Sequence, residues 1–433
     1  MRLLIFFPEI LPDELLYSVF ARYHRNSGNE SSRQTMKDLF ENSSTCSSIW
    51  FPSQLDHLTR QISGQAYTSE DLIQKHTLLP YFTPFIPCER VSRLMETIKG
   101  NVSSAANMIL GRTASTVKPK KFLVYCPDCV NDDREKYGEA YWHRVHQIEG
   151  VCLCPNHGFL LVQSGVSHQN EKNRYHYITL EKALLGASKS TVPFDLLEDE
   201  HLQFVAVQSR ILLQEHLPSP GLQRINQYYV SKLLSKGYVC LASNRIRWDK
   251  LIPAFRGHYR EEMLVNFNGL VTINNEASWL HKLLRKPRVT CHPLRHILLL
   301  GFLGETINSM FEHIDEGKVS FEPFGPGPWP CLNKVAEHYK QEVIHCCTIT
   351  RCSKTGLPVG TFVCSCGFVY SRKGPDKEKN DRFKIGRTKG FGHVWEIKFE
   401  EVSQTNLSLR KKAQILGCDP QTVLNYYKKL QKR

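Results

Sequence analysis

The sequence lacks a long apolar run. Outside the first few residues, its longest such run, Ile297–Leu303, is far shorter than the roughly 20 residues that a helix needs to cross a bilayer. The apolar opening Met1–Phe7 is ended by Pro8, so we expect no secretory signal and no contact with a membrane. We therefore expect a cytosolic protein, in which the 15 cysteines act as metal ligands or buried thiols and not as disulfides.

Acidic residues are scarce relative to basic ones. The 433 residues include 56 Lys and Arg against 42 Asp and Glu, which leaves a formal net charge of +14. Such a surplus favours a polyanionic partner, usually nucleic acid, although a merely basic and soluble surface would give the same number. No paired acidic cluster has the spacing that a metal-dependent nuclease needs, so we expect a protein that is not an enzyme.

The length excludes a single compact core. Hydrophobic cores stop growing at about 250 residues, and an apolar content of 41% is ordinary for a soluble globular protein. We therefore expect a mainly α-helical protein of several domains, with helix-turn-helix modules and two small zinc-finger or zinc-ribbon insertions. The predicted domains are a helix-turn-helix domain with the first zinc finger (1–165), a helical middle domain (166–322), a second zinc-binding module with a basic loop (323–398) and a C-terminal helix-turn-helix (399–433).

Two short chelating pairs form the clearest motif. Cys126 and Cys129 make one pair, Cys154 and His157 make the other, and each pair encloses two residues, one of them a proline. Two such knuckles complete the tetrahedron that zinc prefers and leave no open position for a catalytic water. We prefer this set because only these residues repeat the two-residue spacing. Three neighbours compete as ligands: Cys152, His143 and His146.

A second, less regular group of cysteines follows the Pro- and Gly-rich segment 323–330. A closed tetrahedral zinc site would combine Cys331, His338, Cys364 and Cys366. The apolar residues around the last two fit a pair of strands, so without metal these cysteines would be thiols on one strand face. Four other residues compete as ligands: His345, Cys346, Cys347 and Cys352.

Short amphipathic helices are predicted along the N-terminal third. Asp13 can cap the first of them, whose apolar residues fall on one face and which ends near Ser27–Gly28. The segment Leu79–Phe85, rich in proline and aromatic residues, predicts a rigid packed loop. Short helices joined by polar turns are typical of DNA-binding and protein-docking modules, but also of plain core packing. The other predicted helices lie at 32–40, 53–62, 69–76 and 91–100, and 177–314 is again largely helical.

Basic residues gather in three segments that are candidate contacts to DNA phosphates. One precedes the first zinc knuckle, and one, which also contains Lys282 and Arg295, lies beside Trp279. The third, Ser371–Gly390, has eight Lys or Arg against three acids and predicts a mobile basic hairpin or loop. Solvated charged surfaces are the alternative reading. The candidate phosphate contacts are Lys118, Lys120, Lys121, Arg285, Lys286, Arg288, Arg372, Lys373, Arg382, Lys384, Arg387 and Lys389.

The last predicted element is a helix-turn-helix. Ala413, Gly417 and Val423 have the spacing of a small residue at the helix crossing, a glycine in the turn and a β-branched residue on the recognition helix. Asp419 can cap that second helix, and Pro420 suits its first position. An ordinary helical hairpin is the alternative. Four residues of the second helix are of types that read base edges or phosphates: Gln421, Thr422, Asn425 and Lys428.

These motifs resemble those of the TniQ/TnsD family. The knuckles of the first zinc site and two segments before them resemble the part that the whole family shares, and later segments resemble the TnsD members. The similar segments are spread over nearly the whole chain. They are Pro12–Ser18, His76–Pro80, Cys126–Gly158, Trp279–Leu280, His292–His296, Gly327–Asn333 and Gly360–Phe368.

The resemblance implies a target-site selector of a Tn7-like cut-and-paste transposon, a bacterial cytoplasmic protein associated with the nucleoid. Such selectors bind a chromosomal attachment site in double-stranded DNA and recruit the AAA+ ATPase regulator TnsC, which calls in the transposase subunits. Shorter TniQ relatives are adaptors that link RNA-guided effector complexes to the transposition machinery, but they lack the C-terminal half present in this chain. The residues that match the family's two zinc sites are Cys126, Cys129, Cys154, His157, Cys331, Cys364 and Cys366, with His338 as the eighth ligand.

Overall fold

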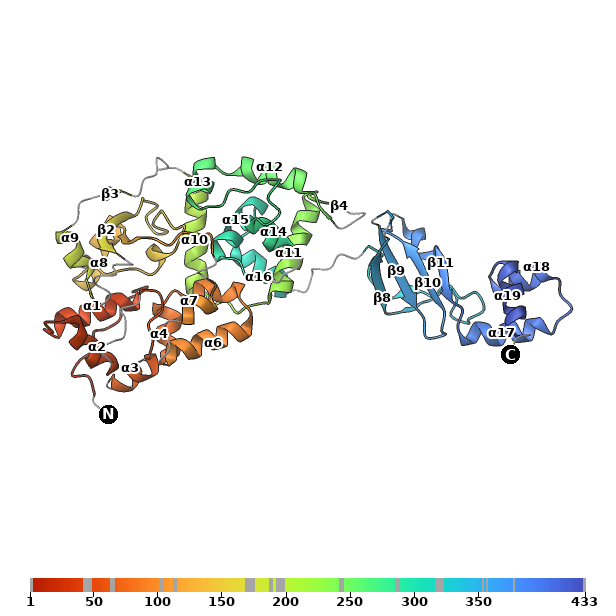
Figure 1. Cartoon of the computed structure of the whole chain (residues 1–433), viewed down its shortest axis with the longest axis horizontal. Helices are drawn as coiled ribbons and strands as arrows, with labels where there is room; N and C mark the ends of the chain where they lie inside the picture. Colours follow the sequence, from red (N-terminus) through yellow and green to blue (C-terminus); the bar gives the residue numbers. More distant parts are fainter. Residues whose placement is uncertain are drawn as a thin grey trace. The chain divides into compact units, whose positions relative to one another are not determined.

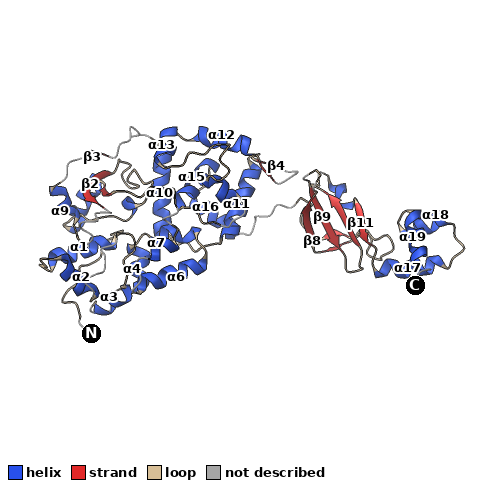
Figure 2. Cartoon of the chain, viewed as in Figure 1, coloured by secondary structure: helices blue, strands red, loops and turns tan. Residues whose placement is uncertain are grey.

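Two compact units make up the structure, a computed structural model. Unit 1 comprises Met1–Lys232 and Trp248–Val319, and unit 2 comprises Leu233–Arg247 and Ser320–Arg433. Helices dominate unit 1, whereas a four-stranded sheet lies in unit 2 (Figures 1 and 2). No helix of the described ranges is long and apolar enough to cross a membrane. The structure describes residues 3–41, 49–62, 67–100, 105–111, 115–167, 176–186, 190–191, 199–240, 245–285, 289–315, 323–352, 354–355, 357–376 and 378–430.

Short helices fill the first part of unit 1, as the periodicity predicts. The predicted bounds are confirmed for α2 (Ser32–Phe40) and α4 (Ser69–His76). α3 (Leu55–Gln61) is shorter than predicted, and α6 (Cys88–Lys99) begins three residues earlier than the predicted start at residue 91. Each of these helices buries apolar residues against its neighbours, because a helix of this length is stable only when it is packed.

The first helix, α1 (Leu16–Asn26), begins without the predicted side-chain cap. Its N-cap position is Leu15, and Asp13 has a left-handed backbone with φ of 53°. The carboxylate of Asp13 instead accepts hydrogen bonds from Nε of buried Arg144 at 3.0 Å and from the amide of Val145 at 3.2 Å. The prediction that Asp13 caps α1 is therefore wrong, because an arginine between the two knuckles takes its carboxylate.

The segment predicted as a packed loop is helical. It forms α5 (Leu79–Phe82) and the 3-10 helix η2 (Thr83–Phe85), each with a proline in its first turn, where no amide hydrogen is needed. Tyr81, Phe82 and Phe85 are buried in the core of unit 1. Their burial confirms the predicted packing, while the assignment of a loop is wrong.

One core joins this region to the helices that follow it. α10 (Glu200–Gln214) packs against α4 and α5 and also against α15 (Pro293–Leu303) and α16 (Ile307–Asp315) (Figure 1). α15 is almost entirely buried, as expected of a helix that is apolar on all sides. The predicted domains 1–165 and 166–322 therefore share one core. The other helices of this region are α7 (Ala105–Ile109), α9 (Leu180–Leu185), α11 (Leu222–Ser235), α12 (Trp248–His258), α13 (Glu261–Asn266) and α14 (Trp279–Leu284).

A small antiparallel sheet in unit 1 frames the first cysteine segment. Its strand order is β1 (Phe122–Tyr125), β2 (Val162–Ser167) and β3 (Ser190–Thr191). Tyr125 lies opposite Val162 in the ladder. The chain that leaves β1 and the chain that enters β2 are therefore neighbours, which brings the two chelating pairs together.

Unit 2 contains a four-stranded antiparallel sheet of order β11-β10-β9-β8 (Figure 1). Phe362 and Tyr370 are direct partners across β9 and β10, and their rings stack 4.9 Å apart. The predicted strand pair around the last two cysteines is thus confirmed. The strands of this unit are β4 (Val239–Cys240), β5 (Arg245–Ile246), β6 (Trp329–Pro330), β7 (Glu342–Ile344), β8 (Cys347–Arg351), β9 (Pro358–Val363), β10 (Val369–Lys373) and β11 (Arg387–Gly390), with the 3-10 helix η6 (Lys379–Phe383) between the last two.

Three helices form a second small core in unit 2. α17 (His393–Ser403), α18 (Leu409–Leu416) and α19 (Pro420–Leu430) pack around Trp395, and Phe391 contacts both this core and the core beside the sheet. The predicted boundary between residues 398 and 399 falls inside α17. Sequence periodicity missed this because α17 belongs to the same core as the helix pair after it.

Candidate metal centres and nucleic-acid interface

Four side chains of the first cysteine segment converge on one point in unit 1. Nδ1 of His157 lies 3.4–3.6 Å from the sulfur atoms of Cys126, Cys129 and Cys154. The sulfurs of Cys129 and Cys154 are 3.6 Å apart. A zinc tetrahedron with Zn–S bonds of about 2.3 Å has edges of about 3.6–3.8 Å. The spacing of these atoms therefore fits a four-coordinate metal ion.

Local backbone structure sets this geometry. Cys126 precedes α8 (Pro127–Tyr137), and Cys129 lies in its first turn. In the second knuckle, the amide of Gly158 donates to the carbonyl of Cys154 at 2.8 Å, and the φ of Gly158 is 73°. A glycine suits this position because a side chain would strain the left-handed backbone.

A carboxylate outside the cluster orients the histidine. Oδ2 of Asp132, on α8, lies 3.2 Å from Nε2 of His157, which leaves Nδ1 for the metal. Hydrogen bonds with Cys126 and Cys129 lower the pKa of Cys154. Burial tends to lower the pKa of His157, but hydrogen bonds with Cys154 and Cys126 raise it to about 9. Without metal the cluster thus already favours a thiolate and a cation beside it.

The competing ligands of this site have other surroundings. Burial raises the pKa of Cys152 to about 11, and this residue is not in the cluster. Nε2 of His143 lies 2.9 Å from Oδ2 of Asp133. Nε2 of buried His146 is 3.9 Å from the sulfur of Cys129, and the cluster closes without it.

The second cluster assembles in unit 2 from the predicted set. The ligand atoms of Cys331, His338, Cys364 and Cys366 all lie within 4.8 Å of one another. The sulfurs of Cys331 and Cys366 are 3.8 Å apart, and Nε2 of His338 lies 3.3 Å from the sulfur of Cys364. Nδ2 of Asn333 donates to the sulfur of Cys366 at 3.6 Å. The competing residues outside this cluster are His345, Cys346, Cys347 and Cys352.

A turn and a close backbone approach hold the second cluster in place. Cys364 and Cys366 lie in the turn between β9 and β10, where the amide of Gly367 donates to the carbonyl of Cys364 at 3.0 Å. Gly392 is the N-cap residue of α17, and a Cβ added to it would lie 2.2 Å from the carbonyl carbon of Gly367. The turn that carries two ligands therefore touches the start of α17 through two glycines.

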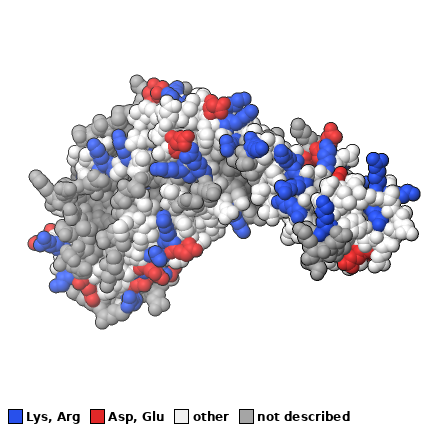
Figure 3. All heavy atoms as spheres, turned by 45° about the vertical axis from the view of Figure 1, so that its right-hand side comes forward, with Lys and Arg blue, Asp and Glu red and all other residues white. Residues whose placement is uncertain are grey.

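One face of the four-stranded sheet is basic. Arg387 lies opposite Ser371 across β11 and β10, so the side chains of both, and that of Lys373 two residues along β10, point to the same face. Lys389 reaches that face as well, because its Nζ donates to Oγ1 of Thr361 at 2.9 Å. Lys and Arg side chains gather over unit 2 in Figure 3, with fewer acids among them.

Two of the predicted phosphate contacts are turned inward. Arg372, 3% exposed, lies over the ring of Phe362 and contacts the carboxylate of Asp376. Nζ of Lys120 donates to the carbonyl of Val151 at 2.7 Å, and burial lowers the pKa of Lys120 to about 8. Both residues stabilise the fold, so their assignment to a DNA-binding surface is corrected.

The remaining basic candidates fall into three groups. Three candidates form ion pairs: Arg285 with Glu276 at 2.8 Å, Arg382 with Glu342 at 2.9 Å and Lys384 with Asp381 at 2.6 Å. Two further candidates are exposed: Lys118 and Lys121. Outside the described residues lie two: Lys286 and Arg288.

α18 and α19 pack against each other, as the helices of either the predicted helix-turn-helix or an ordinary helical hairpin would. Gly417 ends α18 with φ of 66°, and Oδ1 of Asp419 accepts a hydrogen bond from the amide of Gln421 at 2.8 Å, as predicted for a cap of α19. Nε2 of Gln421 donates to Oδ1 of Asn425 at 3.2 Å on the exposed side of α19. Thr422 is half-buried and Lys428 is exposed. The residues buried between the helices include Ala413, Leu416 and Val423.

Sequence reasoning missed the groups that support the metal ligands. Asp132 follows Cys129 by three residues on α8, which places both on one side of the helix. This spacing of three residues could have predicted that Asp132 lies beside the first cluster. Asn333 follows Cys331 by two residues without a regular element, and no periodicity pointed to its contact with Cys366.

Both halves of the chain match known protein families. Residues 205–433 match the family described as Tn7-like transposition protein D, and residues 5–161 match the TniQ family. The chain is 27% identical over 299 residues to the transposon Tn7 transposition protein TnsD of Escherichia coli. The matched part covers 68% of this chain and 56% of the length of that relative.

Proposed function

Because the chain belongs to the family of Tn7-like transposition protein D, we propose that it selects the target site of a transposon by binding double-stranded DNA. In this proposal it is not an enzyme. It reads a chromosomal attachment site and recruits the AAA+ ATPase regulator TnsC, which brings in the transposase subunits. The name of the relative from Escherichia coli supports a role in transposition.

Zinc is the metal that suits both clusters. Each cluster offers three thiols and one imidazole, a ligand set typical of structural Zn²⁺. Four protein ligands leave no position for a water molecule, so the bound ion would supply folding free energy and no catalysis. The cysteines and histidine of each cluster hold the ion, and Asp132 and Asn333 orient or stabilise them from outside.

One observation carries the DNA-binding part of the proposal. A single compact unit offers cations for phosphates, on the sheet face with Arg387 and Lys389, and amide side chains for base edges, Gln421 and Asn425 on α19. Phosphate contacts fix the position of a protein on DNA, and contacts with base edges select the sequence. Unit 2 therefore has both the cations and the amide side chains that a sequence-specific DNA-binding protein needs.

The part of unit 1 that matches the TniQ family is the proposed docking surface for TnsC. This region shares its core with the helices around α10, so it forms a rigid platform and not a separate flexible arm. Under this arrangement unit 1 recruits the ATPase and unit 2 reads DNA.

Footprinting of the purified full chain on a library of chromosomal fragments tests the proposal, with no guide complex present. A selector protects one sequence above the others. Equal protection of all fragments would favour the adaptor of an RNA-guided complex and contradict direct reading. Cleavage of supercoiled DNA that is lost in a folded Cys126→Ser variant would contradict the assignment of a structural metal.

A further inference from the structure

A cavity of about 620 Å³ lies inside unit 1. It is bounded by α6, α7 and residues 115–116, and by α14 and the segment that leads into α15. This volume lies within the range of about 300–1,000 Å³ that is typical of small-ligand sites. No Asp or Glu is among the described residues that line it. Its cationic lining residues are Arg90, Arg93, Lys282 and Arg295.

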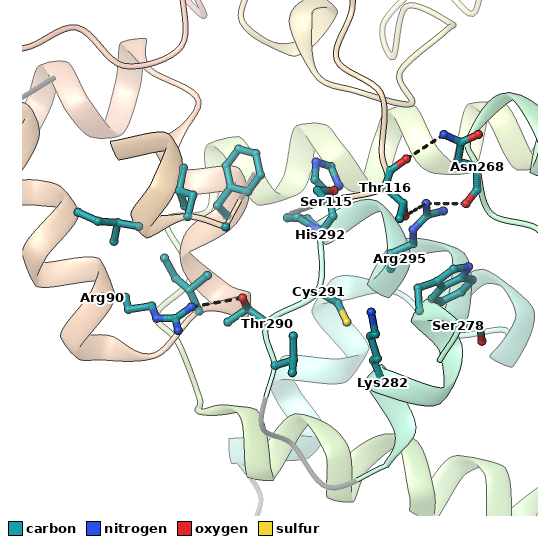
Figure 4. A pocket seen from close by; sticks show the side chains of 18 of the residues that line it. Arg90, Ser115, Thr116, Asn268, Ser278, Lys282, Thr290, Cys291, His292 and Arg295 are labelled. Atoms are coloured by element: carbon teal, nitrogen blue, oxygen red, sulfur yellow. Dashed lines mark hydrogen bonds between the residues drawn. The ribbon is translucent and has the colours of Figure 1, made fainter. Parts of the chain in front are cut away.

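Arg295 forms one wall of this cavity and is only 1% exposed. Its Nη2 donates to Oγ1 of Thr116 at 3.0 Å and to the carbonyl of Asn268 at 2.8 Å (Figure 4). The guanidinium group lies over the ring of Trp279, 5.2 Å from the centroid. Within the described residues, Nε and Nη1 of Arg295 have no hydrogen-bond partner. A buried, charged donor of this kind needs an acceptor.

No carboxylate supplies that acceptor in the described structure. Burial lowers the pKa of Arg295 to about 10, and the groups that oppose this shift are Cys291 and Tyr81. The buried carboxylate of Glu149 instead faces His292, with Oε2 3.7 Å from Nε2 of the ring. A buried cation that lacks a counter-ion destabilises the protein, so an external anion would be held strongly beside it.

Three of the cationic side chains that line the cavity are exposed: Arg90, Arg93 and Lys282. Nη1 of Arg90 donates to Oγ1 of Thr290 at 3.4 Å, which fixes this arginine across the opening. Lys282 and Cys291 extend into the same space in Figure 4. Burial raises the pKa of Cys291 to about 11, with Arg295 and Lys282 acting in the opposite direction. The positive charges of Lys282 on α14 and Arg295 on α15 thus both act on the thiol of Cys291.

We propose that this cavity binds a phosphate-bearing ligand of nucleotide size. The phosphate lies between Arg295 and Lys282, because guanidinium and ammonium groups together match its double charge and its several acceptor oxygens. The apolar lining residues Phe82, Ile86 and Leu270 accommodate a flat organic group. A free mononucleotide and a nucleotide of bound DNA share this chemistry. Binding of a free mononucleotide would be independent of the proposed role in transposition, whereas binding of a nucleotide of DNA rests on the proposed DNA binding.

Calorimetric titration of the full chain with deoxyadenosine monophosphate tests the proposal, with deoxyadenosine as the ligand that lacks phosphate. The monophosphate should bind at least about 10-fold more tightly than the nucleoside, and Lys282→Ala and Arg295→Gln should each weaken it about 10-fold. Lys250→Ala is the matched control, since Lys250 is exposed on α12 and outside the cavity lining. Because Arg295 also holds the fold together, Lys282→Ala carries the test if the other variant does not fold.

A second titration with duplex DNA separates the two sources of phosphate. If the monophosphate does not bind but Lys282→Ala weakens duplex binding and Lys250→Ala does not, the ligand is a nucleotide of DNA. If Lys282→Ala and Lys250→Ala bind both ligands as the unchanged protein does, the proposal is overturned. Sequence preference is measured separately by footprinting, so failure of this inference is distinguishable from failure of the proposed function.

Discussion

Oδ2 of Asp132 lies 3.2 Å from Nε2 of His157, while Nδ1 of the same ring faces three thiols. A carboxylate in this position fixes the tautomer and the orientation of a metal-binding imidazole. The metal affinity of the first cluster should therefore depend on a residue that does not itself bind the ion.

Asp132→Asn should weaken metal binding at the first cluster by about 10–100-fold, the usual effect of removing such a supporting group. Competition with a chromophoric chelator measures the affinity. Asp128→Asn is the control, because Asp128 lies on the same helix but has no contact with His157 among the described hydrogen bonds. Equal affinities for the two variants would show that Asp132 does not support the metal.

Each chain should bind two zinc ions, one in each compact unit. Cys129→Ser and Cys366→Ser should each reduce the metal content from two ions to one, since a tetrahedral site rarely survives the loss of a thiolate. Elemental analysis of the purified protein gives the count. Cys346→Ser, at an exposed cysteine outside both clusters, should retain two ions. A full complement in Cys366→Ser would exclude the second site.

Alanine at Gln421 or Asn425 should lower the affinity for the attachment site by about 1–3 kcal/mol for each lost base contact. Affinity for unrelated DNA should change little, because amide side chains contribute little to phosphate binding. Fluorescence anisotropy with both DNAs measures the difference. Gln414→Ala on α18 is the matched control, since its side chain is exposed on the other helix of the pair. Unchanged specificity in Asn425→Ala would contradict the assignment of α19 as the reading helix.

Removal of the cations of the basic sheet face should weaken binding to all DNA sequences alike. Each phosphate contact releases counterions, so Arg387→Ala and Lys389→Ala should each reduce the slope of log K against log salt by about 0.9. Binding at several salt concentrations gives the slope. Lys75→Ala in unit 1, where Lys75 pairs with Asp71, should leave it unchanged. An unchanged slope in Arg387→Ala would exclude this face from the interface.

Unit 1 should lose stability as the pH falls from about 6.5 towards 4. Burial lowers the pKa of His76 to about 4 and that of His296 to about 3, whereas an unfolded histidine titrates near 6.5. In this window the unfolded chain binds protons that the native state does not, so the free energy of unfolding rises with pH and falls on acidification.

His296→Gln should reduce this pH dependence by up to about 1.4 kcal/mol per pH unit, the equivalent of one proton. Urea unfolding at a series of pH values measures it. Tyr229→Phe is the control, because it removes the hydrogen bond between Tyr229 and Nδ1 of His296 but keeps the imidazole. The same slope in His296→Gln and the unchanged protein would contradict the prediction.

Local sequence patterns were sufficient to predict features that depend on the spacing of residues close together in the chain. The two-residue knuckles around Cys126 and Cys154 lie where β1 and β2 bring them together, and the bounds of α2 follow from its periodicity. The cap at Asp419 is likewise a local contact, since it joins residues two positions apart. Such features depend little on the rest of the fold.

Long-range contacts account for the errors. Asp13 has the composition of a helix cap, but Arg144, more than a hundred residues away, takes its carboxylate. Arg372 and Lys120 are as basic as Arg387 in sequence, yet they face a core because strand alternation and backbone carbonyls orient them inward. Net charge and spacing do not contain that information.

Under the proposed function, the contact between Gly367 and Gly392 has a consequence for attempts to redirect insertion to new genomic sites. The turn that carries Cys364 and Cys366 and the start of the C-terminal helices meet there at a distance that excludes even one methyl group. A chimaera that exchanges only residues from 399 onward would divide α17 and combine a turn from one parent with a helix from another. Exchange of the whole segment from Pro323 onward keeps the two glycines from one parent and is the junction that a retargeted protein should use.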